Sequence, residues 1–331
     1  MKFRVTESDE EWQELLAGRP DALLYHCLPW LRFQVRSFGY QLILLVGHHN
    51  GQVAALLPLL MTQKGPLRVA ASPKGLDYLM LGPLADEPLF GEVLDGYEAW
   101  AKSHGVDYTS MAWTGDIDRN LAESRNYSWE RHINCVIDLA GGEEAVFSRM
   151  NSECRRRIRQ SQKTGVEIIE GDMSSWFEQY VRLSGQIFDR SNKNTILTEA
   201  VLADLVRTIE QIGPVLSIRA EVDGQVAGMY IGAGWRDTFY ALDTVWDRKF
   251  HRCSPNNAMN WYALKWSCQQ GFRRFDLGGG RISNLRKFKA GLGAELVTYS
   301  NIQKAHSWRA RTLVDCKEFF GSLLRKVARS A

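Results

Sequence analysis

Two copies of one short pattern decide the fold of this chain, His49-Asn50-Gly51-Gln52-Val53-Ala54 and Val222-Asp223-Gly224-Gln225-Val226-Ala227. Each copy has Asn-Gly or Asp-Gly followed by Gln-Val-Ala, between two apolar segments. These dipeptides are the strongest short signals for a β-hairpin, because a type I′ turn needs positive φ at both central residues. The sequence therefore predicts one hairpin with strands at residues 42–47 and 52–60 and a second with strands at residues 215–222 and 225–234.

A second pattern follows each hairpin at nearly the same distance. Residues 98–111 indicate the end of a helix, a closing glycine (Gly105) and a strand, and residues 262–277 indicate the same series around Gly271. Two features that recur in the same order at similar spacing predict a duplicated fold. Each half then has the order helix, β-hairpin, further strand, helix, strand.

This order resembles that of the GNAT (acyl-CoA N-acyltransferase) fold. We therefore expect an α+β protein with two tandem, duplicated GNAT-like domains, each a mixed sheet flanked by helices. The 331 residues suit two domains of ordinary size, and Gly141-Gly142 precedes a predicted helix. The expected domains are residues 1–140 and residues 141–331, the second ending in an amphipathic helix from residue 307.

The composition is typical of a globular protein outside the membrane. Hydrophobic residues make up 45% and charged residues 24%, and the net charge of +3 is too small to require a nucleic-acid partner. No segment approaches the run of about 20 apolar residues that spans a membrane, and the N-terminus lacks the apolar core of a signal peptide. The six cysteines and seven histidines show no metal-ligand spacing. We expect a cytoplasmic protein with reduced cysteines and no metal.

The helix predicted over residues 143–163 carries the strongest local charge. Apolar residues recur along it at three- and four-residue steps, with acidic residues at its start and a basic run toward its end. Arg155 and Arg159 share one face of this helix, and Arg156 lies beside them. That face is a candidate site for the phosphates of a nucleotide substrate or a tRNA acceptor stem. An ordinary solvated helix surface is the alternative.

The C-terminal third carries four motifs in close succession: the strand with Phe275-Asp276, the loop Gly278-Gly279-Gly280, the stretch Phe288-Lys289-Ala290-Gly291-Leu292-Gly293 and a strand that reaches Tyr299. Together these motifs resemble the Fem-type peptidyltransferases of bacterial cell-wall synthesis. The basic helix running into Gly165-Val166-Glu167-Ile168 and the pattern that begins at Pro29-Trp30 are similar to the same family. The resemblance covers about residues 30–299. It implies an N-acyltransferase in which an amine attacks an activated acyl group.

The resemblance also implies roles for two basic residues. Lys289 matches the family's functional lysine, a partner for an oxyanion or a phosphate. Arg36 falls where the family carries a basic residue for the diphosphate of a nucleotide-sugar or lipid-linked substrate. A solvated lysine beside a turn and a surface arginine on a helix are the alternatives.

Three further candidates for catalysis lie on strands. The reaction needs a route for the amine proton and donors for the developing oxyanion. Asp276 is either a catalytic carboxylate at a strand end or a structural aspartate that caps the glycine loop. Asp243 and Tyr240, on the preceding strand, either face the acyl-transfer site or belong to a half-buried strand face.

The segment Ser254-Pro255-Asn256-Asn257 bears on the identity of the donor. Acyl-CoA-dependent GNAT enzymes carry a glycine-rich loop here, whose N–H groups bind pyrophosphate at a helix N-terminus. The glycines are missing from this chain, and Pro255 has no N–H to donate. The resemblance implies aminoacyl-tRNA as the donor, since Fem-type enzymes also lack the loop. Ser254 and Asn256 stay candidate anion ligands.

The sequence therefore predicts an acyl- or aminoacyl-transferase with no permanently bound cofactor. Its expected partners are a donor, either aminoacyl-tRNA or acyl-CoA, and an amine acceptor on a cell-wall precursor, polysaccharide or related metabolite, of nucleotide-sugar or lipid-linked type. The alternatives are an acetyl-CoA-dependent GNAT N-acetyltransferase and a non-catalytic binding protein on the same fold. The basic and apolar faces of residues 307–331 suit either peripheral membrane contact or docking on the protein body.

Overall fold

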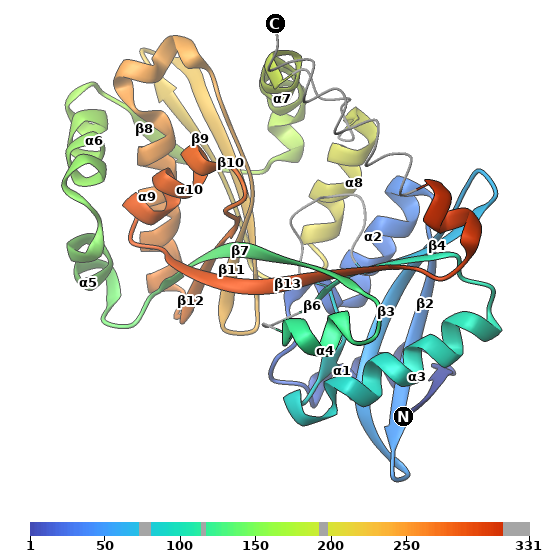
Figure 1. The fold of residues 1–331 in the computed structure, drawn as a ribbon. Coiled ribbons are helices and arrows are strands. Elements are labelled where there is room, and N and C mark those ends of the chain that lie inside the picture. The colour runs from blue at the N-terminus through green and yellow to red at the C-terminus, as the bar shows by residue number, and fades with distance from the viewer. Residues whose placement is uncertain (73–80, 114–116, 192–197, 314–331) are drawn as a thin grey trace, which may run out of the picture. The chain divides into compact units, whose positions relative to one another are not determined.

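The computed structural model describes residues 1–72, 81–113, 117–191 and 198–313 (Figure 1). The chain forms two compact units. Unit 1 comprises Met1–Arg131 together with the chain from Tyr299 onward, and unit 2 comprises His132–Thr298.

Unit 1 contains a mixed sheet with helices on both faces. Its elements in chain order are β1 (Lys2–Val5), α1 (Asp9–Ala17), η1 (Leu24–His26), α2 (Leu28–Phe38), β2 (Gln41–His49), β3 (Gln52–Lys64), β4 (Leu67–Ser72), β5 (Leu84–Ala85), η2 (Glu87–Leu89), α3 (Phe90–Ser103), β6 (Tyr108–Trp113), α4 (Arg119–Glu123) and the end of β13 (Glu295–Ala305).

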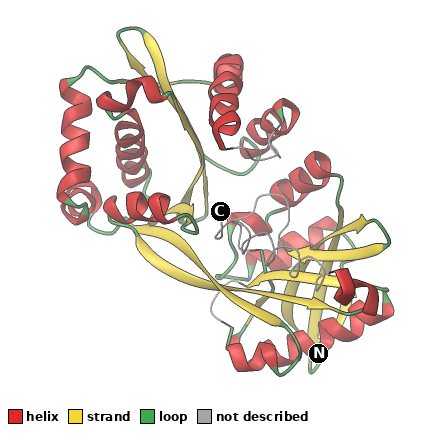
Figure 2. Ribbon diagram, turned by 45° about the horizontal axis from the view of Figure 1, so that its top comes forward, coloured by secondary structure: helices red, strands yellow, loops and turns green. Residues whose placement is uncertain are grey.

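Unit 2 repeats this plan with two additional helices at its start. Its elements are the end of β7 (Ser128–Asp138), α5 (Gly142–Arg149), α6 (Ser152–Lys163), β8 (Glu167–Glu170), η3 (Ser174–Trp176), α7 (Phe177–Ser191), α8 (Glu199–Ile209), β9 (Val215–Val222), β10 (Gln225–Trp235), β11 (Thr238–Trp246), η4 (Arg248–Cys253), α9 (Pro255–Gln269), β12 (Arg274–Gly279), α10 (Ser283–Gly291) and the start of β13. In Figures 1 and 2, helices α5, α6 and α9 lie on one face of its sheet, and α7 and α8 lie on the other.

The two hairpins form as predicted. Asn50 and Gly51 have φ values of 51° and 83°, and Asp223 and Gly224 have values of 49° and 71°. The strands close directly onto these turns, since His49 pairs with Gln52 and Val222 pairs with Gln225. Asparagine and aspartate tolerate the left-handed region better than other side chains, which explains why they precede the glycines here.

The strand pairings confirm the duplicated fold. β1–β2, β2–β3 and β3–β4 are antiparallel in unit 1, as are β8–β9, β9–β10 and β10–β11 in unit 2. In each unit a helix then leads to a parallel strand, so that β6 pairs with β4 and β12 pairs with β11. Both helices, α3 and α9, are followed by a glycine with positive φ, Gly105 and Gly271.

The two halves exchange one strand. β13 follows the last helix of unit 2 but pairs antiparallel with β6 of unit 1 through residues 300–305. β7 follows the last helix of unit 1 but pairs antiparallel with β12 of unit 2. The sheet of unit 1 is therefore completed by a strand that the chain reaches only after passing through unit 2, and the sheet of unit 2 by a strand that precedes all of its other elements.

Polar contacts in unit 1 hold the end of β13 in place. Lys304 Nζ donates to Glu98 Oε1 and to the carbonyl oxygen of Arg125, each at 2.7 Å. The Nε2 of His306 lies 2.8 Å from the hydroxyl oxygen of Thr109, which also bonds the hydroxyl of Tyr97 at 2.7 Å. Charge-assisted bonds of the first kind are among the stronger hydrogen bonds in proteins.

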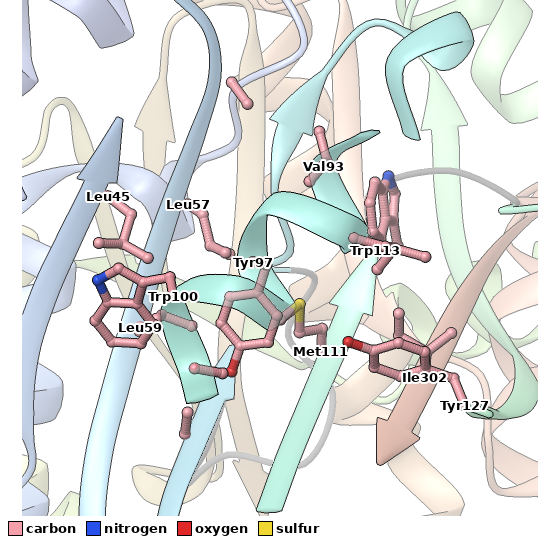
Figure 3. Packing of buried hydrophobic residues seen from close by; sticks show 14 of the residues in the cluster. Leu45, Leu57, Leu59, Val93, Tyr97, Trp100, Met111, Trp113, Tyr127 and Ile302 are labelled. Atoms are coloured by element: carbon pink, nitrogen blue, oxygen red, sulfur yellow. The ribbon is translucent and has the colours of Figure 1, made fainter. Parts of the chain in front are cut away.

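The core of unit 1 lies between α3 and the sheet (Figure 3). Tyr97 and Trp100 of α3 pack over Leu57 and Leu59 of β3, and Ile302 of β13 belongs to the same cluster. Truncating one such large side chain to alanine typically costs about 2–5 kcal/mol. The exchanged strand thus contributes to the hydrophobic core as well as to the hydrogen bonds of unit 1.

The structure differs from the sequence predictions at two points, and a third prediction lies mostly outside the described residues. The helix predicted over residues 143–163 is two helices, α5 and α6, because Asn151 adopts an extended conformation and caps α6 by accepting from the Cys154 N–H at 2.8 Å. The predicted domains 1–140 and 141–331 differ from the observed units, because a division at one point in the sequence cannot represent exchanged strands. Of the predicted C-terminal helix, residues 308–313 are described and helical, and the rest lies outside the described residues.

The exchange predicts that a chain divided at residue 140 gives two fragments that depend on each other. Fragment 1–140 would leave the edge of β6 without β13, and fragment 141–331 would leave the edge of β12 without β7; unpaired edges favour aggregation. We expect poor cooperativity of thermal unfolding for each fragment alone, and a 1:1 complex with the circular dichroism spectrum of the intact chain after co-expression. Two separately stable monomeric fragments would contradict the role assigned to the exchanged strands.

Candidate functional site

The candidate site lies where β11 and β12 part in unit 2. In the described part of the sheet, their parallel pairing covers only Thr238–Tyr240 with Arg274–Asp276. β11 nevertheless continues to Trp246, and β12 continues to Gly279. The backbone of β11 beyond Tyr240 is therefore not joined to β12 by ladder hydrogen bonds. Such an edge offers backbone N–H and C=O groups to a ligand.

A β-bulge on β11 decides which side chains face this place. Ala241 pairs with Gly232, but Asp243 pairs with Ile231, so Leu242 is an additional residue on β11. Side chains alternate along a regular strand, and one extra residue reverses the alternation. The bulge thus puts Asp243 on the same sheet face as Tyr240, away from α9. The sequence prediction named both residues, and the bulge is what brings them to one face.

Asp243 is held by two hydrogen bonds. The Tyr180 hydroxyl of α7 donates to its Oδ2 at 2.5 Å, and the backbone N–H of Thr244 donates to its Oδ1 at 2.9 Å. Burial raises the pKa of Asp243 above its ordinary value, and the two hydrogen bonds act in the opposite direction. A carboxylate with a raised pKa is a better proton acceptor near neutral pH than an ordinary aspartate.

Asp276 makes the contacts expected of the structural role. Its Oδ1 accepts from the Gly278 N–H at 2.6 Å, and its Oδ2 accepts from the Asn134 side-chain amide at 2.9 Å. The side chain is 4% exposed. Burial raises its pKa, while the Gly278 N–H, the Asn134 amide and the charge of Lys289 lower it. The carboxylate fixes the bend at Gly278, where φ is 74°.

Lys289 of α10 is buried against the same bend. Its ammonium group donates to the carbonyl oxygens of Leu277 and Gly279, the second at 2.8 Å, and these bonds use two of its three donors. Burial lowers the pKa of Lys289, and the neighbouring Cys135 and Asp276 raise it. The side chain is therefore neither solvated nor pointing away from the predicted site residues.

Tyr240 and the start of α9 complete the set of predicted residues in this unit. Tyr240 is buried and pairs in register with Asp276. Ser254 caps α9 with a φ of 57°, and its side chain makes no capping bond. The backbone N–H groups of Asn257 and Ala258 both donate to the Ser254 carbonyl oxygen. Since Pro255 has no N–H, the first turn of α9 is poorly supplied with donors for a pyrophosphate.

The predicted basic residues on α6 have structural partners. Arg155 donates to the carbonyl oxygens of Ser148 and Met150 and so caps the end of α5. The other two are more exposed: Arg156 forms an ion pair with Glu153, and the guanidinium of Arg159 lies 5.7 Å from the centre of the Phe147 ring. Water screens exposed ion pairs of this kind, so the pair between Arg156 and Glu153 contributes little to stability.

Arg36 belongs to unit 1, whereas the other predicted site residues belong to unit 2. It is exposed in the last turn of α2. Two residues of the site were not predicted, Tyr180 and Asn134. Helical spacing puts Tyr180 on one face with Leu183 and Ser184, which marks it as buried, but no local pattern identifies Asp243 as its partner.

Within the described ranges, no group of three or more histidine, cysteine, aspartate or glutamate side chains is arranged to hold a metal ion. No helix in the described part of the chain is both long and apolar enough to cross a membrane.

Comparisons with known proteins agree with this geometry. Residues 148–289 match the family model described as an acetyltransferase (GNAT) domain, a segment that ends at Lys289. No curated protein matches the sequence. The matched segment contains β11, β12 and the site residues Asp243, Asp276 and Lys289.

Solved structures with the same fold match nearly the whole chain. FemX is 11% identical with a TM-score of 0.69, covering 91% of this chain and 97% of FemX. L-PGS from Bacillus licheniformis is 14% identical with a TM-score of 0.58, covering 93% and 95%. A tandem GNAT protein from the clavulanic acid biosynthesis pathway is 13% identical with a TM-score of 0.56, covering 92% and 98%. The chain therefore has the fold of these structures, and residues 148–289 match a GNAT acetyltransferase domain.

The contacts of Lys289 predict a large effect of its removal. Lys289→Ala leaves two carbonyl oxygens of the β12 bend without their partner and opens a cavity, so we expect a loss of about 2–4 kcal/mol in the free energy of unfolding. Turnover should fall by on the order of a hundredfold if the ammonium also stabilises an oxyanion. Denaturant unfolding and steady-state kinetics measure the two effects. Exposed Lys287 on the same helix is the control, with an expected change within about 0.5 kcal/mol; full activity of Lys289→Ala would rule out the catalytic role.

Proposed function

We propose that unit 2 transfers an acyl or aminoacyl group to an amine of a cell-wall precursor, a polysaccharide or a related metabolite. The observation that carries this proposal is the open edge of β11 beside Asp243. The edge supplies backbone N–H groups for the carbonyl oxygen of the donor, and Asp243 supplies a proton acceptor with a raised pKa. Both are needed when an amine attacks an activated acyl group.

In the proposed reaction, the amine nitrogen forms a bond to the acyl carbon, and the ester or thioester bond of the donor breaks. The proton lost by the amine passes to Asp243 and then to the leaving oxygen or sulfur. Backbone N–H groups of β11 stabilise the negative charge on the acyl oxygen, and Lys289 adds positive charge nearby. Asp276 and Asn134 hold the bend on which Lys289 is placed.

We propose aminoacyl-tRNA as the donor, with the phosphates bound by the outward face of α6 that carries Arg156 and Arg159. The start of α9 supports this choice, because Pro255 and the bonds to the Ser254 carbonyl leave few N–H groups for a pyrophosphate. Ser254 and Asn256 would then contact the donor without providing the main phosphate site. Acetyl-CoA is the second candidate, supported by the name of the matching family and by the tandem GNAT protein of similar fold.

The proposed acceptor carries its amine on a nucleotide-sugar or lipid-linked carrier, in the cytoplasm. Arg36 of unit 1 is a candidate ligand for the diphosphate of such a carrier, because its guanidinium matches phosphate geometry and is exposed on α2. Peripheral contact with a membrane surface would bring the protein to a lipid-linked acceptor.

Replacing Asp243 tests the proposed base. Asp243→Asn should lower kcat/KM by about 10²–10⁴-fold, measured with charged tRNA or acetyl-CoA and an amine acceptor. The same variant should be more stable than the parent at pH 7. Because the pKa of Asp243 is raised, the folded protein disfavours the carboxylate form. The free energy of unfolding of the parent therefore falls as the pH rises above the unfolded pKa of about 3.8, and this loss is complete above the folded pKa. Thermal unfolding of the parent and of Asp243→Asn, measured from pH 3 to pH 8, tests this difference in stability.

The control for this variant is Asp223→Asn, an exposed hairpin position with φ of 49° that suits asparagine equally well. It should change neither activity nor the pH dependence of stability. Undiminished transfer by Asp243→Asn would remove Asp243 from the mechanism.

The donor site is tested by a double replacement, Arg156→Gln with Arg159→Gln. If both contact phosphates, affinity for charged tRNA should fall and the slope of log K against log salt should decrease by about 2, since fewer counterions are released. Calorimetric titration at two salt concentrations measures this. Arg182→Gln with Arg207→Gln, both exposed in unit 2, is the matched control. Micromolar acetyl-CoA binding that is lost on altering residues 254–257 would favour the acetyl-CoA alternative.

A further inference from the structure

The hydroxyl of Tyr180 is placed on the carboxyl group of Asp243 by a helix outside the β11–β12 pair. α7 packs against β11, and Tyr180 is fully buried. Its hydroxyl donates to Asp243 Oδ2 at 2.5 Å, while Oδ1 accepts from the Thr244 N–H. Asp243 as a whole residue is only partly buried, and its carboxyl is held by these two hydrogen bonds.

Each carboxylate oxygen can accept more than one hydrogen bond. One bond to each oxygen therefore fixes the orientation of the group without using all of its acceptor capacity. A carboxyl that rotated freely about its Cβ–Cγ bond would present either oxygen to the amine, at a variable distance. Proton transfer requires hydrogen-bond geometry in the reacting complex, and a fixed acceptor avoids the cost of ordering it at that moment.

We propose that Tyr180 is a positioning residue for acyl transfer, whose hydroxyl orients the Asp243 carboxyl toward the acceptor amine and keeps it ready to receive a proton. This inference rests on the proposed function, in which Asp243 takes the amine proton. Tyr180 itself touches neither substrate nor the reacting atoms.

The surroundings of Asp243 contain few competing charges. The polar groups that act on its carboxyl are the Tyr180 hydroxyl from α7 and the Thr244 N–H from β11. β10 contributes Ile231 opposite Asp243, and β12 contributes Asp276, whose own oxygens bond Gly278 and Asn134. On α7, Glu178 and Arg182 are exposed, away from the buried face that carries Tyr180. The described charged residues therefore leave Tyr180 as the main side-chain control on Asp243.

The effect of removing the hydroxyl has a definite sign. A hydrogen bond donated to a carboxylate favours the charged form and lowers the pKa, as Tyr180 does for Asp243. Tyr180→Phe removes this bond while keeping the ring. The pKa of Asp243 should rise, and the acid limb of the pH profile of kcat/KM should move to higher pH. At the acid end we expect a loss of about tenfold relative to the parent, and a smaller loss toward the alkaline limit, where only the orientation of the carboxylate is affected.

The test compares three proteins that differ at one position: the parent, Tyr180→Phe and Tyr230→Phe. Tyr230 is a matched control, because it is fully buried in the same unit and its hydroxyl has no hydrogen-bond partner among the described residues. Transfer from charged tRNA and from acetyl-CoA to an amine acceptor is measured from pH 5 to pH 9. Separately, the Asp243 carboxyl is titrated by 13C NMR without substrate, with the resonance assigned by its absence in Asp243→Asn.

A shift of the acid limb and of the carboxyl titration to higher pH in Tyr180→Phe, with neither moved in Tyr230→Phe, supports the proposal. Equal loss at every pH, or a carboxyl titration that moves while the acid limb does not, overturns it. If the parent transfers no group from either donor, the proposed function fails, while the titration still decides whether Tyr180 controls Asp243. If Tyr180→Phe is poorly folded, 3-fluorotyrosine placed at position 180 strengthens the bond and should move both titrations to lower pH.

Discussion

The site depends on a short parallel contact between β11 and β12. Three pairs of residues join these strands, and beyond Tyr240 and Asp276 their backbones separate. The separation is fixed by the bend at Gly278, to which the Asp276 carboxylate and the Lys289 ammonium both bind. An open strand edge inside a sheet is costly when its polar groups have no partner. It persists here because the bend prevents β12 from continuing alongside β11.

The charged groups that shape the site work against burial. Desolvation raises the pKa of Asp243 and of Asp276 and lowers that of Lys289, so each group is less stable in its charged form than it would be in water. Hydrogen bonds from Asn134, Gly278 and Tyr180 recover part of this energy. Proteins tolerate such local costs mainly at functional sites, where a perturbed proton acceptor has a use. Asp243 differs from Asp276 in being partly exposed as a residue, which supports the proton-transfer role proposed for it.

The sequence predicted the parts of the fold that depend on local chemistry. The turns at Asn50-Gly51 and Asp223-Gly224 need only their own φ angles, and the order of elements then indicated the duplicated GNAT-like plan. The strand exchange was not predictable, because nothing in β7 or β13 specifies which unit each will complete. The geometry of the candidate site was likewise not predictable from the sequence. Asp243, Asp276 and Lys289 were named from their positions, but the bulge at Leu242 and the partners Tyr180 and Asn134 are tertiary features.

Duplication raises the question of why the proposed chemistry is assigned to one half. The described strands of unit 1 that correspond to β11 and β12 are β4 and β6, with the sequences LRVAAS and YTSMAW. Neither contains a carboxylate, and β4 pairs with β6 through the last residue of its described length, so the described part of unit 1 shows no counterpart of the open edge at β11. The family match, residues 148–289, likewise falls in unit 2. The bulge, the glycine bend and the buried acids thus lie in unit 2, while the described residues of β4 and β6 carry apolar and neutral side chains apart from Arg68. A buried sheet without such polar groups avoids their desolvation cost, which supports the assignment of the proposed proton transfer to unit 2.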